Sequence, residues 1–300
     1  TITWQINYNG AITGCTDPAS CNYNPLATIA DSSCVYPPNP LCPAPDLVID
    51  EPELANSMYR DNENAANGDC FVAEGCLAGY GNRELIRFST HIRNVGEIDY
   101  FIGAPDTVGN QFIYDQCHNH WHYAGYAEYL LYDVNNQPMQ SGFKNGFCVL
   151  DLECDGGGQG KFSCSNMGIT AGCGDIYDAA LDCQWIDITD IDTGLYTLVV
   201  RVNWDQSPDK LGRYEKSYDN NWGQVCFRLF YNNNGYKDFA IQQTCIPYVD
   251  CANDTFGNAQ LDCANVCNGS SVRGDVDVNL AAETADVNLY LAGIKDESIA

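Results

Sequence analysis

Residues 195–203 read LYTLVVRVN and follow a turn-forming Thr-Gly pair. Valine, tyrosine and threonine are frequent in β-strands because their side chains pack well on a pleated, half-buried surface. A glycine just before such a run supplies the backbone freedom that a turn needs. We therefore predict a buried strand over residues 195–203. Residues 225–231, which read VCFRLFY, have the same character and predict a second strand.

Residues 86–93 read IRFSTHIR and alternate between apolar or β-branched side chains and polar ones. Such alternation is typical of a strand with one buried and one exposed face, so we predict one half-buried strand here. His91 falls on the polar face, and we expect it at the surface. No long segment keeps a helical period, and glycine and asparagine turns are frequent. These patterns predict a mostly β fold, an antiparallel β-sandwich with long, disulfide-pinned loops.

The chain of 300 residues has 40 acidic and 14 basic residues and a formal net charge of −26. This charge would repel the phosphates of nucleic acids, so we expect no nucleic-acid partner. It would instead attract basic proteins or cationic small molecules over long range. No run of about 18 apolar residues occurs, and we expect no membrane span. The chain begins at Thr1 without a visible signal peptide, which indicates a processed or partial chain.

The 17 cysteines indicate disulfides and therefore a secreted or extracellular setting. Four lie before residue 43, ten lie between Cys70 and Cys245, and three follow. Together with a proline-rich linker at 37–45, this grouping predicts three parts: a cysteine-rich leader (1–42), a main domain (43–247) and a small cysteine-containing tail (248–300). The odd count leaves one thiol unpaired or available to another chain, and we expect it in one of the two ends.

Three of the four histidines lie within six residues, 117–122, that read CHNHWH. In a strand, alternate residues point to one side, so His118, His120 and His122 would place three imidazoles on one face. Such a set suits Cu(II) or Zn(II), and the histidines alone do not choose between the two metals. The alternative is a chance cluster on an exposed strand.

The same six residues resemble the copper-binding motif of the lysyl oxidase family. The resemblance continues over about residues 43–247, through segments that occur in the order expected for the family: PDLV at 45–48, SMY at 57–59, EGCLA at 74–78, GFKNGFC at 142–148 and DCQWIDITD at 182–190. The metal, cofactor and activity described next are what this resemblance implies.

By resemblance, His118, His120 and His122 bind copper. Lys144 and Tyr177, which lie in matching motifs, would become linked as lysine tyrosylquinone, the cofactor that this family makes from its own side chains. The ring of Tyr177 would be oxidised with copper and dioxygen, and the amine of Lys144, made neutral by a desolvated pocket, would add to it. A lone lysine is otherwise more often a solvated surface charge.

The implied reaction is oxidative deamination of peptidyl lysine to allysine, with release of ammonia and hydrogen peroxide, in support of extracellular protein crosslinking. The expected partners are basic or lysine-containing extracellular proteins. Residues 43–247 hold 29 acidic and 12 basic residues, and their net charge of −17 would attract such partners. Two alternatives stay open: a non-catalytic building block of an extracellular matrix or filament, and an oxidase of small free amines.

The resemblance also suggests a calcium site with oxygen ligands from Asp46, the Leu47 carbonyl, Glu215, Asn220 and Asn221. Ser217 stands where an aspartate is usual, and a polar turn without a metal is the alternative. By the same resemblance, the ten cysteines of the main domain form five disulfides: Cys70–Cys117, Cys76–Cys183, Cys148–Cys164, Cys154–Cys173 and Cys226–Cys245.

The leader resembles short cysteine-rich repeats of secreted microbial and protist proteins, which implies a role in spacing or attachment. In the tail, residues 285–291 resemble a degenerate dockerin-like calcium loop without the usual Asp-Gly spacing. Asn253 and Asn268 begin glycosylation sequons, which fits an exposed segment of a glycoprotein. Assembly with other chains, if it occurs, is expected to use these terminal segments.

Overall fold

The computed structural model describes residues 11–36, 39, 41–105, 112–115, 120–123, 125–139 and 147–243, together with 245, 249, 251, 252, 254, 259 and 267. At positions 115 and 120 it describes the backbone alone. Several predicted features lie outside these residues: His118 of the metal motif, Lys144 of the cofactor, the sequon residues Asn253 and Asn268, and the dockerin-like segment 285–291.

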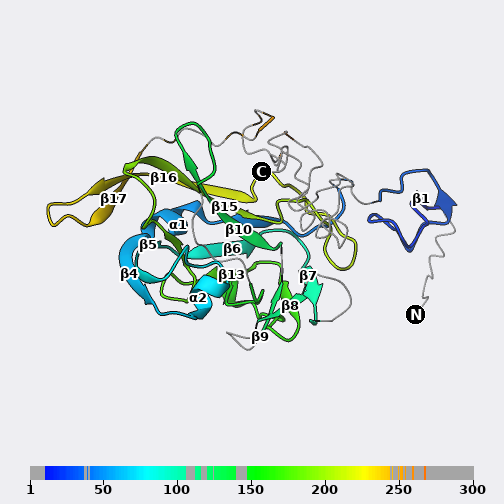
Figure 1. Cartoon of the computed structure of the whole chain (residues 1–300). Helices are drawn as coiled ribbons and strands as arrows, with labels where there is room; N and C mark the ends of the chain where they lie inside the picture. The colour runs from blue at the N-terminus through cyan, green and yellow to red at the C-terminus, as the bar shows by residue number, and fades with distance from the viewer. Residues whose placement is uncertain are drawn as a thin grey trace, which may run out of the picture.

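Two four-stranded antiparallel sheets form the centre of the molecule (Figure 1). The first has the order β10-β15-β16-β17, with bounds Ala127–Asp133, Gly194–Val202, Trp222–Tyr231 and Lys237–Ile241. The second has the order β11-β13-β6-β3, with bounds Glu153–Cys154, Cys173–Tyr177, Thr90–Asn94 and Leu47–Ile49. One apolar core contains Leu198 and Phe227 from the first sheet and Leu47 and Ile92 from the second. Removal of these side chains from water holds the two sheets together as a sandwich.

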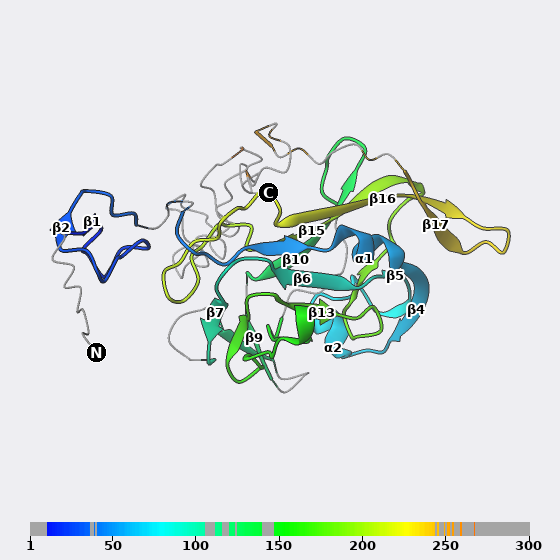
Figure 2. The ribbon, with the colours of Figure 1, turned by 180° about the vertical axis from the view of Figure 1, so that it is seen from behind.

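Smaller sheets flank the sandwich, with β4 and β5 at one end and β7 towards the other (Figures 1 and 2). The order β14-β5-β4 joins Trp185–Asp187, Gly81–Arg87 and Tyr59–Ala65. Three strand pairs complete the list: β7 (Tyr100–Gly103) with β12 (Met167–Ile169), β8 (Phe112–Asp115) with β9 (His120–Tyr123), and β1 (Thr13–Gly14) with β2 (Ile29–Ala30).

The helices of the described residues are short: α1 (Glu51–Asn56), α2 (Cys70–Ala73) and a 3₁₀ turn over Asp155–Gly157. None of them has the length and apolar character needed to cross a membrane. The predicted mostly β fold with antiparallel sheets is confirmed.

The strands predicted over 195–203 and 225–231 are confirmed as β15 and β16. β15 lies between β10 and β16, and all its residues from Tyr196 onward are buried. Its two faces contact different clusters, with Leu198 in the large core and Val199 packed beside Tyr132. A strand buried on both faces is typically rich in apolar residues, and this strand is so except for Thr197 and Arg201, the latter paired with Glu128.

The single strand predicted over 86–93 is wrong, because β5 and β6 are separate strands of different sheets. The face expected to be exposed is also buried: Arg87, Ser89 and His91 are 7%, 3% and 8% exposed. The guanidinium of Arg87 lies over the ring of Trp185 at 4.5 Å, so a further layer of the protein covers these polar side chains. The expectation that His91 lies at the surface is therefore wrong as well.

Seven disulfides join described cysteines. Four of them confirm predicted pairs: Cys76–Cys183, Cys148–Cys164, Cys154–Cys173 and Cys226–Cys245. Three lie in the ends: Cys15–Cys34, Cys21–Cys42 and Cys251–Cys267. Cys70 is also disulfide-bonded, and its predicted partner Cys117 lies outside the described residues. These bonds restrict the unfolded chain and pin the long loops between strands.

A buried ion pair holds the flanking sheet together. Asp187 on β14 is 2% exposed, and its carboxylate accepts hydrogen bonds from Arg83 Nε at 2.8 Å and from the Ala78 N–H at 3.0 Å. The other side of the Arg83 guanidinium contacts Asp190 at 2.6 Å, and the Asp190 side chain is 71% exposed. Loss of a buried partner is costly because the opposite charge stays buried.

We predict that Asp187→Asn lowers the free energy of unfolding by about 3 kcal/mol, since Arg83 would keep its charge in a buried site. Asp190→Asn removes the exposed partner of the same arginine and serves as the control, with an expected loss below about 1 kcal/mol. Urea unfolding with the disulfides intact measures both. Equal losses in the two variants would contradict a special role for the buried pair.

Candidate functional site

Residues 120–122 of the predicted metal motif lie on β9, which pairs antiparallel with β8. Positions 120 and 122 alternate on β9 and share one face of the strand, as predicted for the metal ligands. His122 is 9% exposed and lies opposite Ile113 in the register. Trp121 lies opposite Tyr114, with ring centroids 5.3 Å apart in an edge-to-face contact. Residues 120–122 of the motif are therefore in the strand conformation that the metal prediction needs, while residues 117–119, His118 among them, lie outside the described residues.

Tyr177, the predicted cofactor tyrosine, ends β13 and is 6% exposed. Its hydroxyl donates a hydrogen bond to the carbonyl of Cys148 at 2.9 Å. The ring of Phe147 meets its ring edge-on at a centroid distance of 5.2 Å. Phe147 and Cys148 close the motif that contains Lys144, so the structure places Tyr177 against the segment that follows the predicted cofactor lysine.

Burial strengthens the preference of the Tyr177 phenol for its neutral form. It raises the pKa of the Tyr177 phenol well above 10, and the negative charge of Asp175 raises it further. Burial and the same carboxylate also raise the pKa values of Tyr126 and Tyr129, which are 1% and 0% exposed. The three phenols are therefore neutral at neutral pH. Sequence reasoning missed Asp175, although its place two residues before Tyr177 on a strand was a signal that the two share a face.

The residues predicted for calcium come together from two distant segments. The Glu215 carboxylate accepts a hydrogen bond from the Leu47 N–H at 2.6 Å and another from Asn221 Nδ2 at 3.0 Å. Asn220 Nδ2 donates to Asp46 Oδ1 at 3.1 Å. All five predicted residues thus form one group, in which Glu215 is 7% exposed.

This group has the character of a site for a hard cation. The Oδ1 atoms of Asn220 and Asn221 are buried and have no hydrogen-bond partner in the described part of the chain. Burial raises the pKa of Glu215 to about 7, and it also raises the pKa of Asp46. Desolvated carboxylates and uncompensated amide oxygens are costly alone and would be stabilised by a calcium ion, which prefers oxygen ligands. The residues present therefore fit calcium.

Ser217, which replaces the usual aspartate, borders the same group. Its backbone N–H hydrogen-bonds the Asp46 carboxylate, and its Oγ accepts from the Asp219 N–H at 3.1 Å. Asp219 itself is exposed. The site consequently has a hydroxyl where a third carboxylate would stand.

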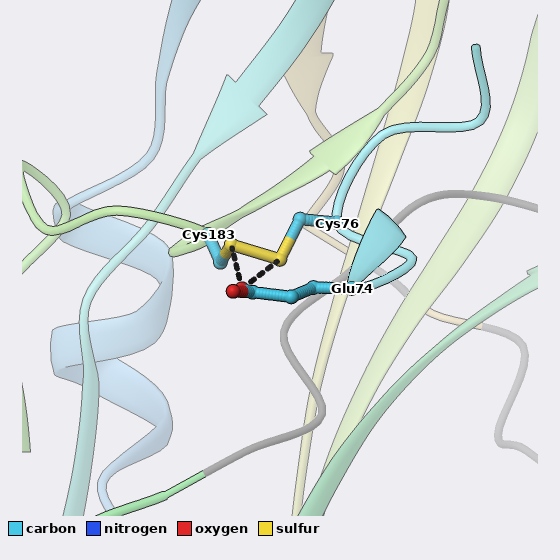
Figure 3. Close-up of side chains that lie close together, drawn as sticks. All are labelled: Glu74, Cys76 and Cys183. Carbon is cyan, nitrogen blue, oxygen red and sulfur yellow. Dashed lines mark hydrogen bonds between the residues drawn. A yellow bond between two sulfur atoms is a disulfide. The ribbon is translucent and has the colours of Figure 1, made fainter. Parts of the chain in front are cut away.

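A third group of metal-ligating residue types, Glu74, Cys76 and Cys183, lies at the C-terminal end of α2 (Figure 3). The two sulfur atoms are joined as a disulfide, and Glu74 Oε2 lies 3.9 Å and 3.8 Å from them. Disulfide sulfurs carry neither a proton nor a thiolate charge, and the thiolate is the form of cysteine that binds metals. The group is therefore a carboxylate packed against a structural crosslink.

Comparison with known proteins places the chain in a family. The family profile described as Lysyl oxidase matches residues 45–245. Lysyl oxidase homolog 3A of Danio rerio is 36% identical over 172 residues, which cover 53% of this chain and 23% of the relative. Lysyl oxidase homolog 4 of Homo sapiens is 33% identical over 198 residues, or 62% of this chain and 25% of the relative. Lysyl oxidase homolog 2 of Rattus norvegicus is 36% identical over 172 residues, or 53% and 22%.

The matched region spans about a quarter of the length of these curated relatives, from 22% to 25%. Within this chain, the profile match runs from Pro45, next to Asp46, to Cys245 of the last predicted disulfide, and it includes the paired strands β8 and β9 and Tyr177. With more than half of its residues matched, the chain belongs to the lysyl oxidase family.

Proposed function

We propose that this protein is a copper- and quinone-dependent oxidase of peptidyl lysine in extracellular proteins. Family membership supports an oxidoreductase of the amine oxidase type, and the family together with the disulfides supports secretion. The observation that carries the finer proposal is the placement of Tyr177. Its hydroxyl is held by Cys148, four positions after Lys144, in a buried site beside the chain segment that would supply the amine.

The residues of this chain suit the proposed cofactors. His118, His120 and His122 offer imidazole nitrogens, which are good ligands for copper. When bound, copper would supply redox chemistry with dioxygen, and the linked Lys144–Tyr177 quinone would accept electrons from the substrate amine. The aromatic pair Tyr114 and Trp121 would hold β8 and β9 together, and Phe147 would keep water from the Tyr177 ring.

The charge of the main domain supports basic, lysine-containing proteins as partners. The net charge of residues 43–247 is −17, and such a field speeds the approach of cationic groups. Salt screens this attraction, so the approach of cationic partners is faster at low and physiological ionic strength than at high ionic strength. We also propose that calcium binds the group around Glu215 and joins β3 to the loop before β16.

The crosslink itself is the first test. Copper-loaded protein exposed to dioxygen should yield a Lys144–Tyr177 linked peptide by mass spectrometry and should release hydrogen peroxide with a lysine-containing protein substrate. Tyr177→Phe should abolish both, because it removes the oxygen that the quinone requires. Tyr231→Phe, at a tyrosine that is 61% exposed, is the control and should retain both. Absence of crosslink and peroxide in the unmodified protein would favour the alternative of a non-catalytic building block. A parallel assay with a small diamine as the sole substrate tests the alternative of a small-amine oxidase.

Copper binding by the three histidines is the second test. His122→Ala should weaken copper binding by about 100-fold, because one of three imidazole ligands is lost from a buried position. Ile113 lies opposite His122 and is 57% exposed, so the Ile113→Ala variant should bind copper normally. Competitive titration against a chromophoric chelator measures both affinities. Unchanged binding in His122→Ala would show that the ligand assignment is wrong.

Calcium binding is the third test. Glu215→Gln should lower calcium affinity by about 100-fold, and Ser217→Asp should raise it about tenfold, because affinity follows the number of charged ligands. Asp219→Asn alters an exposed carboxylate and should leave affinity unchanged. Isothermal titration of chelator-treated protein measures all three. Normal calcium affinity in Glu215→Gln would place the ion elsewhere.

A further inference from the structure

Asp175 is a fully buried carboxylate in the main core. In the proposed function it is neither a metal ligand nor a precursor of the quinone. It is 0% exposed and lies in the middle of β13, where its neighbour across the sheet is Ile92. Alternation along the strand places Asp175 and Tyr177 on the same face. A carboxylate is rarely buried this completely unless the protein uses or compensates its charge.

The segment 148–150 contacts the side chains of both Asp175 and Tyr177. The carbonyl of Cys148 accepts the hydrogen bond from the Tyr177 hydroxyl at 2.9 Å, and the N–H of Leu150 donates to Asp175 Oδ2 at 3.4 Å. The chain then continues beside β13, where the Leu152 N–H donates to the carbonyl of Gly174 at 2.9 Å. Asp175 and Tyr177 are thus held side by side, against the segment that follows Lys144.

Oxidation of a phenol requires that its proton leaves. A carbonyl such as that of Cys148 accepts a hydrogen bond, but it is far too weak a base to take the proton, whereas a carboxylate can take it. A free phenol is already protonated at neutral pH, and burial raises the pKa of Tyr177 further, so that ionisation becomes still less favourable. Among the carboxylates of the described residues, Asp175 contributes most to raising this pKa, through its negative charge.

We propose that Asp175 is the base that takes the phenolic proton of Tyr177 when the quinone is made, an inference that rests on the proposed function. In this step the O–H bond of Tyr177 breaks, its electron pair stays on the phenolate oxygen, and the proton bonds to a carboxylate oxygen of Asp175. Dioxygen, used with copper, is the oxidant of the steps that follow. The transfer moves one negative charge by a short distance inside the core and creates no additional buried charge.

The test compares the rate of Lys144–Tyr177 crosslink formation in Asp175→Asn with that of the unmodified protein, both loaded with copper and supplied with dioxygen. The asparagine keeps the shape and the acceptor for the Leu150 N–H but cannot take a proton. We expect a rate about 100-fold lower at neutral pH, as is typical for loss of a general base, and substantial recovery in alkaline buffer, where hydroxide takes the proton. A rate equal to that of the unmodified protein at neutral pH would overturn the proposal.

The control is Asp151→Asn. Asp151 is half-buried, and its carboxylate accepts hydrogen bonds from the Thr170 N–H at 2.8 Å and the Lys161 N–H at 2.7 Å. This variant should lose stability and keep the crosslinking rate. If it slows crosslinking as much as Asp175→Asn does, and alkali rescues neither, Asp175 is a structural residue and the proposal fails. If the unmodified protein forms no crosslink, the proposed function fails first, and the two failures are thereby separated.

A second measurement needs no variant. Time-resolved difference infrared spectroscopy of the unmodified protein during crosslinking should show the carbonyl stretch of a protonated carboxylic acid, and ¹³C-labelled aspartate should shift that band. Crosslink formation without such a band would overturn the proposal even where Asp175→Asn does not fold.

Discussion

The antiparallel pairing of β13 with β6 is the constraint on which the interior of this protein depends. It sets Asp175 opposite Ile92 and Tyr177 opposite Thr90, so that both side chains stay in the core while the strands remain paired. On the other edge, β11 pairs with β13, and the Cys154–Cys173 disulfide links the same two strands covalently. A phenol held between two fixed neighbours cannot turn towards solvent without breaking sheet hydrogen bonds, and its raised pKa follows from that confinement.

The contrast between β15 and the 86–93 segment shows what local pattern can predict in this fold. Residues 195–203 are mostly apolar or β-branched, and burial on both faces explains this composition, so the strand could be predicted from its own sequence. Residues 86–93 also look like one strand, but their alternation shows only which side chains are polar. It does not show whether other segments of the protein bury these polar side chains. Arg87 stacks on Trp185, and His91 is packed against the backbone of Gly174, whose added Cβ would lie 2.5 Å from His91 Nε2.

The candidate sites divide in a similar way. Residue types and spacing were enough to point to a metal at CHNHWH, because three alternating histidines are unusual in any strand. The group proposed for calcium joins Leu47 to Glu215, which lie 168 positions apart, and only the family resemblance could pair them in advance. The buried amide oxygens of Asn220 and Asn221 are a property of the folded chain, since no sequence pattern shows which atoms lack a partner. Asp175 was visible in the sequence, but its importance depends on knowing that its side of β13 faces the core.

The structure also changes the meaning of the charge of −17 counted over residues 43–247. Inside the protein, Asp187 and Asp209 are paired with Arg83 and Arg213, and close opposite charges cancel at long range. At the surface, the amines of Lys161 and Lys216 lie against Asp99 and Glu97. The amine of Lys237 is buried and donates to the carbonyls of Ile188 and Thr189.

Exposed acids without such partners in the described residues, for example Asp178 and Asp182 just after Tyr177, remain to attract cations. Because screening limits this attraction to about 8 Å at physiological salt, the acids nearest the reacting side chains matter most. The same excess of acid therefore acts in two directions under the proposed function. It would draw in lysines from other proteins, and it holds the amines of Lys161 and Lys216 in ion pairs that an oxidation would first have to break.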